Sequence, residues 1–367
     1  MKNCMTNRVL FIVPLPPPVH GSSMMCQYIK DSHLINEEFD CEYVNLSASR
    51  SMTEVHKFQF IKIWRMYLSY LIVAWKLMTK RYDLCYVALA FHASLLKDAP
   101  MVLLCKLFRR KVVVHLHGKG ASADAQNVLY LWLLKRVFHN TKVILLSWLL
   151  YPDIAQFAKK EDVSICPNGI PFIETDYNGN KNDIPRLLFL SNLIISKGVF
   201  VLLDALKILK QRGYKFACDF VGGETKEINS KRFEEEIKQR QLDDIVFYHG
   251  RKYGDEKDTY FKKSDIFVFP SNEDCFPLVL LEAMTWHLPI ITTNEGAIPD
   301  EVRDGENGLV GEQKNPLSIA NCIEKLLCDE SLRIKMGEDG FQKFQKYFTI
   351  NAFELNIKNI LVEYSQN

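Results

Sequence analysis

ETDYNGNKNDIPRLLFL, residues 174–190, divides the chain into two halves, each with the same alternation of short apolar runs and helical patterns. The polar residues from Glu174 to Ile184 are typical of a linker, because Asn, Gly and Asp favour turns. Arg186–Leu190 then begins a new apolar strand, just as Arg8–Val13 does near the start of the chain. This restart predicts two domains joined by one linker.

Both halves alternate short apolar runs with helical patterns, which is typical of parallel α/β units. The first half has further predicted strands at 82–87, 111–116 and 142–146, and the second at 216–221, 245–248, 265–269 and 289–292. We therefore expect an α/β fold of two Rossmann-like, doubly wound parallel-sheet domains facing across a cleft, with ligands at the carboxyl ends of the strands. The expected boundaries are 1–175 for the first domain, 176–345 for the second, and 346–367 for a C-terminal helix returning to the first domain.

Composition favours a globular protein of the reduced cytoplasm. Of the 367 residues, 46 are Lys or Arg and 44 are Asp or Glu, so the net charge of +2 argues against a nucleic-acid partner. The ten cysteines contain no C-x-x-C pair and mostly lie in apolar runs, as buried thiols do. Prolines interrupt the first apolar run, and no stretch has the ~18 uncharged apolar residues of a membrane span. Neither G-x-G-x-x-G nor a P-loop motif follows the first strand of either half.

SNEDCFPLVLLE, residues 271–282, places two acids eight residues apart at the ends of an apolar segment. Pro277 suits the first turn of a helix, so the backbone N–H groups of Cys275 and Phe276 are expected to point at a phosphate or a sugar hydroxyl. The segment that begins at Leu278 packs the helix into its domain. Asp274 and Glu282 then emerge toward the cleft, from the loop and from the helix respectively. The alternative is that Asp274 is a helix cap and Glu282 a solvated helix residue.

At this point the sequence resembles a known family. Pro270-Ser271, Asp274-x-Phe276, Leu281-Glu-Ala-Met284 and Pro289 resemble the E-x7-E region of family 4 retaining glycosyltransferases, which have the GT-B fold. The likeness runs through almost the whole chain. Five further segments follow the family's motifs: Pro167-Asn-Gly-Ile170, Ser191-Asn-Leu193 with Lys197-Gly198, Gly296-Ala-Ile-Pro-Asp300, Asp304-Gly-Glu-Asn-Gly-Leu309, and His117-Gly118.

The resemblance implies a role for each candidate residue of the second half. Asp274 would hold hydroxyls of the donor sugar, although the family commonly has a glutamate there, and Glu282 would hold the ribose. Lys197, beside a glycine that allows close backbone approach, suits a diphosphate. Many relatives have an arginine where this chain has Asn192, and Arg251 is a candidate replacement for that cation.

In the first half, Gly21 and Ser22 follow the first strand, and their N–H groups are expected near the phosphate or the acceptor. A merely structural turn is the alternative. His117 ends a buried strand and resembles the family's first-domain histidine, while a core histidine is the alternative. His115 is expected on the opposite face of the strand. The candidate catalytic residues are thus Lys197, Asp274 and His117, and the candidate donor-binding residues are Gly21, Ser22, Asn192, Lys197, Arg251, Asp274, Cys275, Phe276, Leu278 and Glu282.

No base–nucleophile dyad stands out. The resemblance implies front-side transfer, in which the leaving phosphate accepts the acceptor's proton and the protein positions the reactants and stabilises the growing charge. No catalytic metal and no cofactor are expected, only a nucleotide sugar as co-substrate, with UDP favoured over GDP. The function expected is transfer of a hexose or N-acetylhexosamine to a glycan or lipid-linked acceptor in bacterial surface polysaccharide biosynthesis.

Residues 56–82 hold six Lys or Arg, no acid and several interleaved aromatic residues. Such a helix can rest on an anionic membrane surface, which would suit a polyprenyl-linked acceptor. A core-packed helix pair with snorkelling lysines is the alternative.

Other functions remain open on the sequence alone. A sugar-nucleotide epimerase or a phosphorylase can share the two-domain fold, although phosphorylases are generally much larger. A non-catalytic, two-lobed sugar-binding protein is the alternative from a different class.

Overall fold

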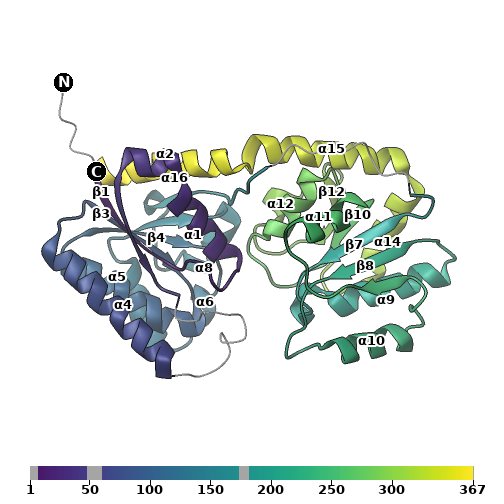
Figure 1. Ribbon diagram of the computed structural model, residues 1–367, viewed down its shortest axis with the longest axis horizontal. Coiled ribbons are helices and arrows are strands. Elements are labelled where there is room, and N and C mark those ends of the chain that lie inside the picture. The colour runs from purple at the N-terminus through teal and green to yellow at the C-terminus, as the bar shows by residue number, and fades with distance from the viewer. Residues whose placement is uncertain (1–6, 48–59, 173–181, 367) are drawn as a thin grey trace. The chain divides into compact units, whose positions relative to one another are not determined.

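The computed structural model describes residues 7–47, 60–172 and 182–366, and the chain forms two compact units (Figure 1). Unit 1 comprises Met1–Gly169 and Ile350–Asn367, and unit 2 comprises Ile170–Thr349. Residues 174–181 of the expected linker lie outside the described residues. The sequence-based boundaries were 175/176 and 345/346, and residues 350–367 group with unit 1.

Unit 1 contains a six-stranded, all-parallel sheet in the order β2-β1-β3-β4-β5-β6. Its strands are β1 Arg8–Val13, β2 Asp40–Asn45, β3 Leu84–Leu89, β4 Lys111–Leu116, β5 Lys142–Leu145 and β6 Val163–Ile165. Its helices are α1 Gly21–Asp31, α2 His33–Glu38, α4 Phe60–Thr79, α5 Leu95–Leu107, α6 Ala121–Asp124, α7 Val128–Phe138, α8 Tyr151–Ile154 and α16 Ile350–Gln366, with short 3-10 turns at His92–Ser94, Trp148–Leu150 and Lys160–Asp162.

Unit 2 contains a second six-stranded, all-parallel sheet in the order β12-β11-β10-β7-β8-β9. Its strands are β7 Arg186–Leu190, β8 Ala217–Val221, β9 Val246–Tyr248, β10 Ile266–Phe269, β11 Ile290–Thr293 and β12 Gly308–Gly311. Its helices are α9 Val199–Gln211, α10 Ser230–Gln239, α11 Gly254–Lys262, α12 Leu278–Thr285, α13 Ile298–Glu301, α14 Pro316–Cys328 and α15 Glu330–Tyr347, with a 3-10 turn at Ile195–Lys197.

The central strands are apolar along their whole length because helices cover both faces of a parallel sheet. Every residue of β3 and of β10 is buried. In unit 2 the core is rich in phenylalanine, and Phe189 of β7 lies 5.0 Å from Phe220 of β8 between ring centroids. The predicted doubly wound α/β fold is confirmed for both units.

The strand orders place a switch point in each sheet, where the chain changes direction across the sheet. In unit 1 it lies between β1 and β3, and in unit 2 between β7 and β10. Ligands of open α/β sheets bind at the carboxyl ends of the strands beside such a point. The loops after β7 and β10 are therefore where unit 2 is expected to bind a ligand.

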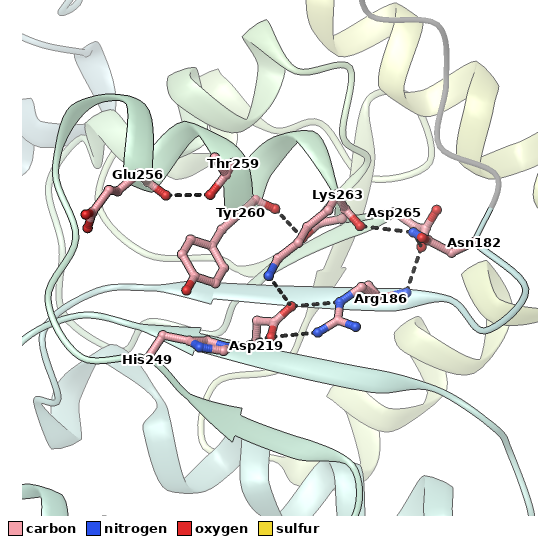
Figure 2. A network of polar contacts seen from close by, with 10 residues as sticks. Asn182, Arg186, Asp219, His249, Glu256, Thr259, Tyr260, Lys263 and Asp265 are labelled. Carbon is pink, nitrogen blue, oxygen red and sulfur yellow. Dashed lines mark hydrogen bonds and ion pairs between the residues drawn. The ribbon is translucent and has the colours of Figure 1, made fainter.

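A network of polar contacts holds α11 onto the sheet of unit 2 (Figure 2). The buried Asp219 of β8 receives two hydrogen bonds of 2.9 Å from Arg186 and lies 2.6 Å from His249 Nε2. Burial raises the pKa of Asp219, but the hydrogen bonds from Arg186 and His249 outweigh it and lower the pKa overall. Tyr260 of α11 packs on His249 with ring centroids 4.7 Å apart, and Lys263 lies over the Tyr260 ring. The network thus fixes the helix that carries Lys257.

Three strands have no counterpart among the predicted ones. β2 carries polar residues at half of its positions, β6 has only three residues, and β12 begins and ends with glycine. All three lie in the outer part of a sheet, where short or polar strands are tolerated. Two predicted helices begin later than expected: α9 at Val199, after a left-handed Gly198, and α10 at Ser230, because the Asn229 side chain caps it.

Candidate functional site

Lys197 and Asp274 lie together on the two loops that flank the switch point of unit 2. Lys197 ends the short turn after β7, and Asp274 follows β10. The ammonium nitrogen of Lys197 lies 2.6 Å from Asp274 Oδ2 and donates to the carbonyl of Glu273 at 2.7 Å. Both side chains keep partial exposure, 22% for Lys197 and 18% for Asp274. The pair is therefore fixed in position while remaining accessible.

Glycine at 198 allows these two loops to pack closely. Gly198 has φ +82°, and a Cβ atom there would lie 2.1 Å from the carbonyl oxygen of Pro270. The N–H of Asn272 also donates to the carbonyl of Ser196 at 2.7 Å. Any larger residue at 198 would push the Lys197 loop away from the loop that carries Asp274.

A second glycine supports the Asp274 loop from the other side. Gly296 has φ +56°, and a Cβ atom there would lie 2.3 Å from the carbonyl oxygen of Asp274. The N–H of Ala297 donates to the carbonyl of Cys275 at 2.8 Å. The segment that follows β11 thus holds the backbone of residues 274 and 275 in place.

The start of α12 differs in detail from the sequence prediction. Pro277 is the N-cap residue, not the first helical residue, because its ψ of 113° is extended and the helix begins at Leu278. The N–H of Cys275 donates to Asp274 Oδ1 at 2.9 Å, so this expected ligand donor bonds to the neighbouring carboxylate. Phe276 is buried and packs edge-on against Phe348. Leu278 is half-buried at the first position of the helix.

Glu282 projects from α12 and pairs with a residue that sequence reasoning missed. Its Oε1 lies 2.8 Å from the ammonium nitrogen of Lys257 on α11, and both side chains are partly exposed. Nothing in the local sequence marked Lys257, since it is one of several lysines on a polar helix. The structure thus pairs Asp274 with Lys197 and Glu282 with Lys257.

Asn192 and Arg251 meet at the loop after β8. Asn192 Oδ1 accepts a hydrogen bond of 3.1 Å from the N–H of Gly223. A Cβ atom on Gly223 would lie 2.4 Å from both Nε and Nη2 of Arg251, so the guanidinium lies against this glycine. Arg251 therefore lies against Gly223, whose N–H donates to Asn192, and it stays a candidate for the cation that Asn192 does not provide.

Glu301 is a further acid that sequence reasoning did not single out. It ends α13, is fully buried, and neither carboxyl oxygen has a hydrogen-bond partner among the described residues. Burial raises its pKa well above the usual range, and the nearby Asp274 raises it further, against the opposing charge of Lys343. A neutral carboxyl group next to Asp274 avoids a second negative charge at this site.

In unit 1, Gly21 and Ser22 lie at the start of α1 and not in a loop. His20 is the N-cap residue: its ring Nδ1 accepts the N–H of Ser23 at 3.3 Å, and Ser23 Oγ accepts the N–H of His20 at 3.0 Å. Ser22 Oγ lies 3.1 Å from the same Nδ1 atom. The histidine cap was missed because Ser, Thr, Asp and Asn are the usual N-cap residues.

The prediction that His115 and His117 lie on opposite faces was wrong. Their ring centroids are 4.1 Å apart, because residues two positions apart along an extended chain point to the same face. His115 is fully buried and hydrogen-bonds through Nδ1 to the hydroxyl of Tyr86.

The ring of His117 is buried at both nitrogens, and neither has a hydrogen-bond partner among the described residues. Burial, and to a smaller extent the nearby His20, lower the pKa of His117 to about 4, against an opposing contribution from Asn168. The imidazole is therefore neutral at physiological pH, able to donate or accept a hydrogen bond but not to act as a cation.

Unit 2 also has a cavity of about 570 Å³ at the opposite, amino-terminal edge of its sheet. Arg186 and Ala217, the first residues of β7 and β8, line it together with Asn182 and Phe247. It is a second place where a small molecule can fit, remote in the fold from the loops that carry Lys197 and Asp274. Among the described residues, no three His, Cys, Asp or Glu side chains are grouped so as to hold a metal ion.

Comparisons with known proteins show that unit 2 is similar to a described family. Residues 173–343 match the family model described as Glycosyl transferases group 1. A capsular polysaccharide biosynthesis glycosyltransferase of Staphylococcus aureus, CapM, is 28% identical over 237 residues, which are 60% of this chain and 61% of that protein. An uncharacterised glycosyltransferase of Methanocaldococcus jannaschii is 28% identical over 69% of this chain and 68% of its own length.

Solved structures show the fold. A sucrose-phosphate synthase from Thermosynechococcus elongatus aligns over 97% of this chain and 99% of its own, with a TM-score of 0.77 at 16% identity. Anabaena HepE, solved with UDP, aligns over 97% of this chain and 100% of its own, with a TM-score of 0.74 at 16% identity, and was also solved with UDP-glucose. The chain thus has the GT-B fold of two Rossmann-like domains.

Proposed function

We propose that the protein is a retaining glycosyltransferase of family 4 that moves a hexose or N-acetylhexosamine from a nucleotide sugar to a glycan or lipid-linked acceptor. The observation that carries the proposal is the Lys197–Asp274 pair, 2.6 Å apart at the switch point of the sheet within the residues that match the family model. A cation and a carboxylate side by side suit a ligand with a diphosphate and several hydroxyl groups.

In this proposal Lys197 stabilises the charge that grows on the leaving diphosphate, and Arg251 adds a second positive charge beside the loop of Asn192. Asp274 accepts hydroxyl protons of the donor sugar, and Glu282 does the same for the ribose. Gly296 keeps the Asp274 loop in its position.

The leaving phosphate takes the acceptor's proton, so no protein base is needed. The nucleotide sugar is the only co-substrate, and neither a metal nor another cofactor takes part. UDP is the favoured nucleotide, in keeping with the UDP and UDP-glucose complexes of Anabaena HepE. Surface polysaccharide biosynthesis, at the cytoplasmic side of the membrane, is the favoured process, in keeping with the capsular role named for CapM.

The test is release of nucleoside diphosphate from a panel of UDP- and GDP-activated hexoses and N-acetylhexosamines, with and without polyprenyl-linked saccharide acceptors. The proposal predicts release from one donor class that an acceptor accelerates, with the α or β configuration of the donor kept in the product. Binding of a nucleotide sugar without transfer would favour a sugar-binding protein. Interconversion of the donor sugar without release would favour an epimerase.

A further inference from the structure

α4 of unit 1 exposes a continuous row of large apolar side chains. Ile61, Trp64, Leu68, Leu71, Trp75 and Met78 recur every three or four residues, and each is between 38% and 65% exposed. This spacing lines one face of a helix, and we call these six residues the outer stripe. Tyr67 and Ile72, also exposed, widen it. A soluble helix normally turns such a face to the core.

The opposite face of α4 is fixed, so the helix cannot roll to bury the outer stripe within unit 1. Val73 and Leu77 are buried in the core of the unit. The hydroxyl of Tyr70 donates to the carbonyl of Lys97 on α5 at 2.8 Å, and Arg110 donates to the carbonyl of Leu77 at 3.4 Å. Figure 1 shows α4 beside α5 on the outside of unit 1. α4 is thus apolar on both its inner and its outer face.

The charges of α4 all have one sign. The helix and the residues directly after it carry Lys62, Arg65, Lys76, Lys80 and Arg81, and no acid occurs from 60 to 82. Lys76 and Lys80 both pair with Glu42 of β2. Trp64, Tyr67 and Trp75 each combine an apolar ring with a polar edge, as is typical of side chains at a membrane surface. Protein–protein interfaces are enriched in aromatic residues and methionine but depleted of lysine, so the lysines of α4 and its lack of acids are what favour an anionic lipid surface.

A pocket of about 320 Å³ opens on the flank of α4, at the carboxyl ends of β1 and β2. Arg65, Leu68, Ser69 and Ile72 of α4 form one wall, and Asn45 and Ser47 contribute from the end of β2. Leu68 belongs both to this wall and to the outer stripe. A surface that covers the outer stripe therefore passes beside the mouth of the pocket.

We propose that α4 lies in the interface of an anionic lipid bilayer, with the outer stripe among the upper acyl chains and its cations at the lipid phosphates. Among the described residues no helix is long and apolar enough to cross a membrane, so the contact is peripheral. One further step rests on the proposed function. A lipid-carried acceptor would reach the pocket beside α4 from the head-group layer.

The experiment measures co-sedimentation of the full chain with vesicles of phosphatidylcholine alone or mixed with phosphatidylglycerol, with no donor or acceptor present. We expect binding that grows with phosphatidylglycerol content and weakens with salt, and a blue shift of tryptophan fluorescence from Trp64 and Trp75. The double variant Leu71→Ser with Trp75→Ser should bind roughly tenfold more weakly or worse.

The matched control is Leu317→Ser with Ile334→Ser, which removes two comparably exposed apolar side chains from α14 and α15 of unit 2. It should bind vesicles as the unchanged protein does. Absence of binding at every phosphatidylglycerol content, or equal loss in both double variants, would overturn the proposal. So would a dimer in analytical ultracentrifugation that Leu71→Ser with Trp75→Ser abolishes, since a second copy would then cover the stripe. UDP titration of the α4 double variant measures nucleotide binding alone. It therefore separates a failure of the membrane proposal from a failure of the proposed glycosyl transfer.

Discussion

Lys197 and Asp274, 77 residues apart in the chain, are joined by an ion pair of 2.6 Å across the switch point of the unit 2 sheet. Two loops from different strands meet here because Gly198 lets one backbone approach the other. The carboxylate orients the ammonium group before any ligand arrives. Such preorganisation makes a charged group effective in stabilising a transition state, because little rearrangement is needed during the reaction.

Replacing Lys197 tests the charge-stabilising role. Lys197→Ala should lower turnover by roughly 10²–10³-fold, as expected when one donor to a developing negative charge is removed. Lys207→Ala, which changes an exposed lysine on the neighbouring helix α9, is the control and should leave turnover as it is. Steady-state kinetics with the best donor measure both. Equal turnover of Lys197→Ala and the unchanged enzyme would remove Lys197 from the mechanism.

Glu282 can be tested separately from its ion pair with Lys257. If its carboxylate holds the ribose, Glu282→Ala should weaken UDP binding by roughly ten- to a hundred-fold, the loss typical of hydrogen bonds to a charged group. Lys257→Ala breaks the same ion pair but keeps the carboxylate, so it should bind UDP much more tightly than Glu282→Ala does. Isothermal titration calorimetry gives both affinities. The same loss in both variants would mean that the ion pair alone matters.

Gly296 offers a test of loop support that holds backbone strain constant. Alanine at Gly296 or at Gly305 must adopt a positive φ, which costs about 1–2 kcal/mol in either case. Only at Gly296 would the new Cβ atom meet a neighbour, the Asp274 carbonyl at 2.3 Å, whereas nothing lies within 4 Å at Gly305. Gly296→Ala should therefore lose donor affinity and Gly305→Ala should not, although both melt at lower temperature. Comparable donor affinities would argue against this support.

The buried His117 predicts acid sensitivity of unit 1. Its pKa falls from the ordinary 6.5 to about 4 on folding, so the unfolded chain binds more protons between these values. Stability is therefore fully present above pH 6.5 and is lost as the pH falls toward 4, by up to about 1.4 kcal/mol per pH unit from this group. His117→Asn should reduce that slope, whereas His33→Asn, an exposed change in the same unit, should not. Urea unfolding at a series of pH values measures it, and an unchanged slope in His117→Asn would contradict the assignment.

The fold was predictable because its strands are uniform apolar runs. β1, β4 and β7 occur with the bounds read from the sequence, since a strand buried on both faces leaves an unbroken signature. β2 and β12 were missed because outer strands need no such run. Spacing and resemblance also selected Lys197 and Asp274, which the structure brings together.

The sequence could not show which side chains of other helices and strands contact the candidate site residues. The position of α11 brings Lys257 to Glu282, and that position depends on the Asp219 network shown in Figure 2. The burial of Glu301 was likewise invisible, because an acid next to Asp300 in a short polar turn reads as solvated.

The most direct measurement is the structure of the protein with UDP bound. The account predicts the diphosphate within hydrogen-bond distance of the Lys197 ammonium group and a ribose hydroxyl on the Glu282 carboxylate. UDP in the cavity at the amino-terminal edge of the same sheet, beside Arg186 and Phe247, would contradict it. So would a complex in which Lys197 still bonds only to Asp274 and Glu273 while the nucleotide binds elsewhere.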